Sequence, residues 1–117
     1  MNPVEAWKTV VLERYAKFDG RAARPEFWWF YLANVIVAIG FFVLMRISGI
    51  FFILDLLYFL AILVPSIAVS IRRLHDSNKS GWFLLFGFIP FVGSIILLVF
   101  FCLAGTPGPN PFGTGPE

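Results

Sequence analysis

Residues 27–45 read FWWFYLANVIVAIGFFVLM, a run of 19 residues without a charged side chain. A helix of this length is about 28 Å long, close to the roughly 30 Å hydrocarbon core of a bilayer. Two further apolar runs follow at residues 50–71 and 82–104. The three runs predict an all-α membrane protein with three transmembrane helices. Because Pro90 interrupts the third run, we expect that helix to be kinked near residue 90, with a re-entrant return as the alternative.

The composition agrees with a single membrane domain over residues 1–117. Hydrophobic residues make up 59% of the chain and charged residues 14%, whereas an average soluble domain is about 45–50% apolar and about 25% charged. A small soluble domain leaves too much surface in water to hide this apolar area. The composition therefore argues against a soluble enzyme, a nucleic-acid binder and a disordered chain.

The distribution of basic residues predicts an orientation. Five Lys and Arg residues precede the first run, three lie in residues 72–81, one lies in residues 46–49, and residues 105–117 have none. We expect the N-terminus and the 72–81 loop to be cytoplasmic. The 46–49 turn and the irregular tail, residues 105–117, are then expected outside.

Residues 3–19 are predicted to form an amphipathic interfacial helix. Asn2 is a good N-cap, and Pro3 suits the first helical position. Steps of three and four residues place one apolar stripe along the helix, formed by Val4, Trp7, Val11, Tyr15 and Phe18. We expect this stripe to rest on the membrane surface, on the spanning helices, or on both.

Few polar residues fall inside the apolar runs. Asp55 is the only ionisable one, about 7–8 Å from the outer end of its helix. Intramembrane acids are candidates for function, but this shallow depth favours a structural ion pair with Arg46. Asn34, Ser66 and Ser70 are expected to form hydrogen bonds between helices.

The densest polar run, residues 72–81, contributes most of a candidate site for anionic lipid or a partner. With the N-terminal arginines on the same side, it forms a basic face at the level of lipid head groups, with Asp76 or Glu26 orienting the arginines. The simpler alternative is a solvated turn whose arginines only follow the positive-inside rule. The candidate residues are Arg21, Arg24, Arg72, Arg73, His75, Asp76, Lys79 and Trp82.

We expect no catalytic residue, metal or cofactor. His75 is the only histidine, so a zinc site lacks ligands, and the single cysteine, Cys102, excludes an intrachain disulfide and a thiolate cluster. Next to Ser77, His75 and Asp76 do not form a triad, because neighbours on a short loop cannot hold that geometry.

Three stretches resemble signatures of one family of small bacterial inner-membrane proteins, known as domain of unknown function 805. They are FDGRAARPEFWWF at residues 18–30, RRLHDSNKSGWFLLFGFIPFVG at 72–93 and AGTPGPNPFG at 104–113. The resemblance implies a small polytopic protein of a bacterial cytoplasmic membrane and implies no reaction. The matching residues are Gly20, Arg21, Arg24, Glu26, Trp28, Arg73, Leu74, His75, Asp76, Gly81, Trp82, Pro90, Gly93, Gly105, Thr106, Asn110 and Gly113.

The sequence predicts a non-enzymatic accessory or interaction protein. Its expected partners are anionic membrane lipids and either further copies of the chain or another membrane protein, but not nucleic acid. The alternative is a subunit of an oligomeric small transporter or channel, in which Asp55 or Asn34 would face a shared lumen. That alternative requires oligomers, because three short spans make a poor pore alone.

Overall fold

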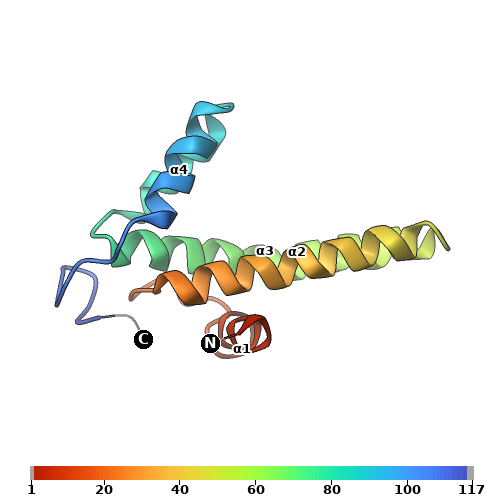
Figure 1. Ribbon diagram of the computed structural model, residues 1–117, viewed down its shortest axis with the longest axis horizontal. Helices are drawn as coiled ribbons and strands as arrows, with labels where there is room; N and C mark the ends of the chain where they lie inside the picture. The colour runs from red at the N-terminus through yellow and green to blue at the C-terminus, as the bar shows by residue number, and fades with distance from the viewer. Residues whose placement is uncertain (1, 116–117) are drawn as a thin grey trace.

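The computed structural model describes residues 2–115, and its regular structure within this range is helical. The elements are α1 (Pro3–Lys8), the π-helix η1 (Thr9–Glu13), α2 (Arg24–Met45), α3 (Ile50–Asp76), the 3₁₀-helix η2 (Gly81–Phe88) and α4 (Val92–Cys102). The last two residues of the predicted tail, 116 and 117, and residue 1 lie outside the described range. In Figure 1, α2 and α3 lie side by side as a long antiparallel pair, from which α4 leans away at one end.

The long pair accounts for the first two predicted spans. The mean hydropathy of the most apolar window is 2.1 in α2 and 2.5 in α3, and only 11% and 6% of these windows are buried within the protein. This exposure distinguishes the two helices from the core helices of a soluble protein, which hide their apolar faces. The helix α3 extends beyond the predicted run, so residues 72–76 form its last turn rather than a loop.

The prediction of a third span over residues 82–104 is wrong. The chain forms η2, turns at residues 89–91 and returns as α4, and these two helices pack against each other.

Two local features explain the return. Pro90 cannot donate a backbone hydrogen bond, and Phe91 has a φ of 60°, which breaks the helix. At Gly93 the backbones approach so closely that a Cβ would collide with the Phe86 carbonyl. The 11-residue α4 is about 16 Å long, roughly half a hydrocarbon core.

The N-terminal helix is shorter than predicted. Asn2 caps α1 as expected, because its side chain accepts a hydrogen bond from the Glu5 amide at 2.8 Å. Regular structure ends at Glu13 rather than at residue 19. The buried residues are Ala6 and Val10, outside the predicted stripe. Within the stripe, Trp7 and Val11 pack against the core, and Val4, Tyr15 and Phe18 are exposed. The wider turn of the π-helix changes the 3.6-residue phase on which the stripe depended.

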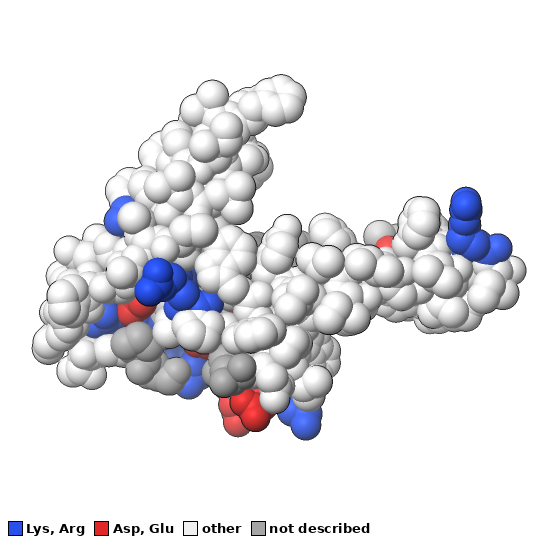
Figure 2. All heavy atoms as spheres, viewed as in Figure 1, with Lys and Arg blue, Asp and Glu red and all other residues white. Residues whose placement is uncertain are grey.

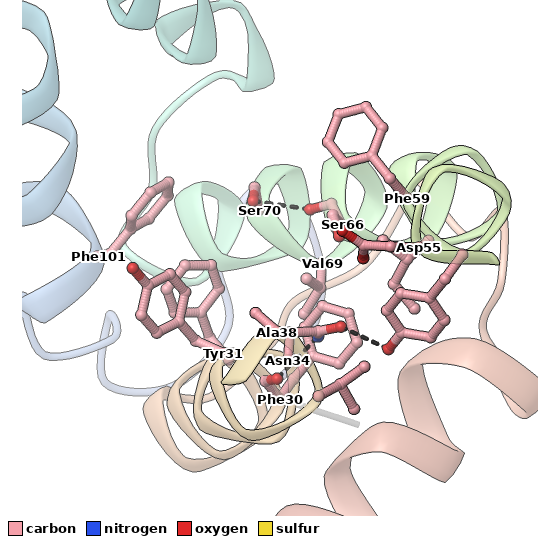
Figure 3. A pocket seen from close by; sticks show the side chains of 14 residues that line it. Phe30, Tyr31, Asn34, Ala38, Asp55, Phe59, Ser66, Val69, Ser70 and Phe101 are labelled. Atoms are coloured by element: carbon pink, nitrogen blue, oxygen red, sulfur yellow. Dashed lines mark hydrogen bonds between the residues drawn. The ribbon is translucent and has the colours of Figure 1, made fainter. Parts of the chain in front are cut away.

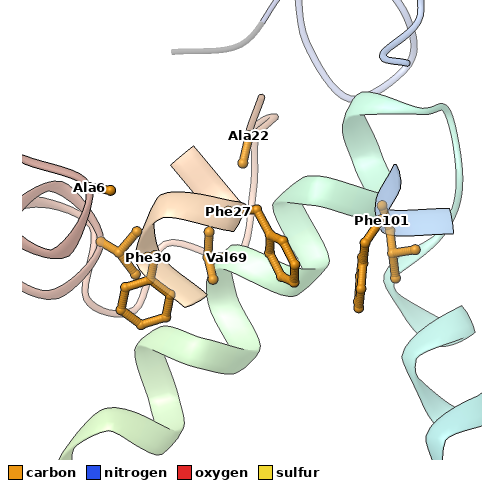
Figure 4. Packing of buried hydrophobic residues seen from close by; sticks show 8 residues of the cluster. Ala6, Ala22, Phe27, Phe30, Val69 and Phe101 are labelled. Carbon is orange, nitrogen blue, oxygen red and sulfur yellow. The ribbon is translucent and has the colours of Figure 1, made fainter. Parts of the chain in front are cut away.

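The hydrophobic core lies at one end of the long pair. Figure 4 shows its central residues, which come from six different segments of the chain: Ala6, Val10, Ala22, Phe27, Phe30, Val69, Leu74 and Phe101. Phe27 and Phe101 bring α2 and α4 together, with ring centroids 4.5 Å apart. This end therefore fixes the N-terminal segment and the η2–α4 hairpin to the long pair.

Candidate functional site

Four arginines and two carboxylates meet at the core end of the long pair; we call this group the arginine cluster. Asp76 accepts hydrogen bonds from Arg21 Nε at 2.9 Å and from Arg73 Nη1 at 3.0 Å. Glu26 accepts from Arg72 Nη1 at 2.7 Å and from Arg14 Nη1 at 3.1 Å. Except for Arg14, all of these side chains are buried. The structure thus places Asp76 and Glu26 against the arginines that we expected them to orient.

The arginine cluster carries an excess of positive charge. Its buried part holds three guanidinium groups, those of Arg21, Arg72 and Arg73, and two carboxylates, so the formal charge of this part is +1. Removing such charges from water is costly, and carboxylates offset that cost only where the ion pairs and hydrogen bonds are good. Arg72 Nη2 is buried without a hydrogen-bond partner among the described residues. The cluster therefore creates a positive potential that two carboxylates do not cancel.

The C-terminal tail wraps around Arg21 and His75. Arg21 donates to the Thr106 carbonyl at 2.7 Å and to the Gly108 carbonyl at 2.8 Å. The Asn110 side chain donates to the His75 carbonyl at 2.9 Å. Phe112 stacks on the His75 ring with centroids 4.1 Å apart. Tail carbonyls thus accept hydrogen bonds from those guanidinium N–H groups of Arg21 that do not donate to a carboxylate.

Arg73 and Gly105 complete this attachment of the tail. Arg73 donates to the carbonyls of Phe101 and Leu103, which lie at and just beyond the end of α4. A side chain at Gly105 would collide with the Asp76 carboxylate, so the tail can approach only with glycine at this position. The predicted separation of the tail from residues 72–81 by a membrane is therefore wrong, because the tail contacts Arg21 and His75 directly.

All eight candidate residues lie at this end, but they divide into two groups. Arg21, Arg72, Arg73 and Asp76 are buried, and His75 contacts the tail, so they hold the fold together. The accessible members are Arg24 and Trp82, which are exposed, and Lys79, which is half-buried.

Arg24 and Lys79 flank the C-terminal end of α4, and we call them the basic rim. Arg24 Nη1 donates to the Cys102 carbonyl at 3.4 Å, and Lys79 Nζ lies 5.1 Å from the centre of the Phe100 ring. Figure 2 shows the charged side chains gathered at this end, while most of the long pair is white. Cations are favourable at a helix C-terminus, and here they stay within reach of a ligand outside the protein.

A groove runs between α2 and α3, with one wall formed by Phe101 of α4 (Figure 3). Its volume is about 430 Å³, and most of its lining is apolar. Tyr58 bridges the helices: its hydroxyl donates to Asn34 Oδ1 at 2.7 Å and accepts from Trp7 Nε1 at 3.0 Å. The predicted interhelical role of Asn34 is therefore present, and Tyr58 and Trp7 were not anticipated as its partners.

Two other predictions about polar residues differ from the structure. Ser70 donates to the Ser66 carbonyl within the same helix, so it does not link helices. The predicted Arg46–Asp55 ion pair is not among those of the described residues. Arg46 instead lies over the Phe42 ring, 5.7 Å from its centre, and Asp55 lines the α2–α3 groove.

Sequence reasoning missed Arg14 and the tail carbonyls as parts of the cluster. Arg14 is separated from Glu26 by an irregular segment, so no helical periodicity relates them. The signal available for the tail was its resemblance to a family signature. Within residues 2–115, no group of three or more His, Cys, Asp or Glu side chains is arranged to hold a metal ion.

Comparisons with known proteins agree with this architecture of a small membrane protein. The chain is 48% identical over 113 residues to inner membrane protein YhaI of Escherichia coli K12, covering 95% of each chain. It is 41% identical over 116 residues to inner membrane protein YhaH of the same strain, covering 95% of this chain and 96% of YhaH. No solved structure matches the chain. The profile of the family described as protein of unknown function DUF805 matches residues 15–114. The chain therefore belongs to the DUF805 family.

Proposed function

We propose that this chain is an inner-membrane accessory protein without enzymatic activity, whose basic rim binds the head groups of anionic lipids. The observation that carries the proposal is the excess positive charge at one end of the long pair. Arg24 and Lys79 lie at the surface there, above buried ion pairs with a formal charge of +1. Anionic head groups supply the compensating charge at the membrane surface.

The positive-inside rule supports a cytoplasmic location for this end. Eight of the nine basic residues lie either before the first apolar run or in residues 72–79. In the proposed topology, α2 and α3 cross the membrane, the η2–α4 hairpin enters and returns, and both the N-terminal segment and the tail are cytoplasmic. In a Cys102→Ser background, an impermeant maleimide should label Thr114→Cys and Ser77→Cys from the same side, and Ser48→Cys from the other. Labelling of Thr114→Cys together with Ser48→Cys would contradict this topology.

Lipid retention tests the proposed function. The protein is reconstituted in nanodiscs containing equal amounts of phosphatidylglycerol and phosphatidylcholine, and the retained lipids are measured by native mass spectrometry. The Arg24→Gln/Lys79→Gln double variant should lose most of the preference for phosphatidylglycerol. The expected drop is roughly thirtyfold, from about 1 kcal/mol for each basic residue near an anionic surface.

Arg46→Gln is the matched control, because Arg46 carries the same charge at the opposite end of α2. It should leave the preference unchanged. Equal retention of the two lipids by the unmodified protein would refute the proposed function. Arg21 and Arg73 are less suitable targets, since they are buried in the cluster.

An oligomeric transporter or channel subunit is the second candidate. Asp55 favours it, because this carboxylate lines the α2–α3 groove together with Asn34 and Tyr58. The same native mass spectra report the oligomeric state. A strictly monomeric particle in both detergent and nanodiscs would eliminate this candidate.

A further inference from the structure

The α2–α3 groove has the length and the lining of a site for one extended hydrocarbon chain. Along α3 its lining runs from Asp55 to Ser70, 15 residues apart, a distance of about 22 Å by helical rise. Most of the side chains that form its walls are aromatic or aliphatic, which favours contact with a hydrocarbon chain.

A group that suits a lipid head group lies near the core end of the groove. Phe27 and Phe101 line this end, whereas Arg24 lies outside the groove lining, in a small pocket that it shares with Asp76 and Thr106. Arg24 lies one helical turn before Phe27, and it donates to the carbonyl of Cys102, the neighbour of Phe101. This 3.4 Å hydrogen bond is the one described for Arg24, so other guanidinium N–H groups remain for a ligand.

Trp28 also marks this end as the membrane interface. Its indole N–H donates to the Phe101 carbonyl at 3.3 Å, and its ring packs edge-on against Phe27. Trp side chains favour the boundary between head groups and hydrocarbon. The polar end of the groove therefore lies where a lipid phosphate would lie.

We propose that the α2–α3 groove binds one acyl chain of an anionic phospholipid whose phosphate pairs with Arg24. The arginine cluster behind Arg24 adds its excess charge to the attraction. This inference rests on the proposed function and deepens it, because it assigns the lipid a position within the fold. The groove holds the chain by contact with its apolar walls, and Arg24 selects the charged head group.

The test fills the groove with an added side chain. Ser66→Phe places a benzyl group into the lining, whereas Ser94→Phe makes the same change on the exposed surface of α4, outside the groove. Both variants are reconstituted with dipalmitoyl phosphatidylglycerol and examined by native mass spectrometry under increasing collisional activation. Ser66→Phe should retain roughly tenfold less lipid, as expected when about two methylene groups lose their contacts. Ser94→Phe should retain as much lipid as the unmodified protein.

A second variant keeps the test decisive if Ser66→Phe does not fold. Ala38 lines the opposite wall of the groove and is exposed, so Ala38→Phe fills the same space without disturbing a buried residue. Thermal unfolding of each variant identifies those that are folded. Undiminished retention by a folded groove variant would overturn this inference.

The same experiment separates this inference from the proposed function. If groove variants retain lipid normally and the preference for phosphatidylglycerol over phosphatidylcholine persists, the basic rim acts without the groove, and only the inference fails. If the unmodified protein shows no such preference, the proposed function fails. Dihexanoyl phosphatidylglycerol, which has the same head group on short chains, should be retained less than the dipalmitoyl lipid, and equal retention would also overturn the role of the groove.

Discussion

The two ends of the α2–α3 pair are closed in different ways. At the far end, the four residues 46–49 connect the helices, and the surrounding side chains are mostly exposed. At the core end, charged side chains from the N-terminal segment and α3 are buried together, and the tail packs over them. No ion pair described for residues 2–115 links the helices at the first end, whereas buried ion pairs hold the second. Substitutions should therefore have large effects at the core end and small effects at the far end.

Removal of Asp76 should produce the largest effect. Asp76→Ala leaves Arg21 and Arg73 buried without their shared carboxylate, and losing one partner of a buried ion pair costs about 3–5 kcal/mol. We expect the tail to detach and the folded yield to fall. Thermal unfolding in detergent, followed by circular dichroism, measures the loss. Asp76→Asn keeps the shape and one carbonyl acceptor, so it should be less harmful; equal stability of Asp76→Ala and the unmodified protein would show that the cluster does not hold this end.

Gly93 tests whether the hairpin is attached by close packing. Gly93→Ala adds a Cβ that collides with the Phe86 carbonyl, and such overpacking typically costs about 1–3 kcal/mol. We expect η2 and α4 to separate, which should expose the hairpin to limited proteolysis in detergent. Gly40→Ala is the matched control in α2, because a Cβ added at Gly40 would meet nothing within 4 Å beyond its chain neighbours and the backbone of its own helix. Similar proteolysis of the two variants would argue against close packing of α4 on η2.

The long pair and the η2–α4 hairpin show how far the sequence predicted the fold. The long pair was predictable, because hydropathy over about 20 residues identifies membrane-spanning helices without knowledge of their neighbours. The hairpin was not, since Pro90 is compatible with a kink and with a reversal. The collision at Gly93 that accompanies the reversal involves the backbone of Phe86, seven residues earlier in another helix.

The candidate site was predictable in its members and not in its form. The positive-inside rule grouped the basic residues on one side, and the structure brings the eight candidate site residues to one end. Burial of Arg21 depends on the Thr106 and Gly108 carbonyls, 85 and 87 residues away in the sequence. Backbone acceptors leave no trace in residue identity, because every residue has a carbonyl group. The sequence analysis therefore assigned Arg21 to a ligand site, whereas in the structure tail carbonyls already accept its hydrogen bonds.

The far end should give the smallest effect. Arg46→Gln removes a charge that lies over the Phe42 ring and outside any described ion pair, and surface substitutions of this kind usually change stability by less than about 0.5 kcal/mol. Asp55→Asn should behave alike if the carboxylate has no structural partner, and the double variant should then show only the sum of two small changes. Thermal unfolding of the two single variants and the double variant measures any coupling between these residues. Coupling above about 0.5 kcal/mol would reveal an Arg46–Asp55 interaction in the membrane and would make the two ends more alike than the structure indicates.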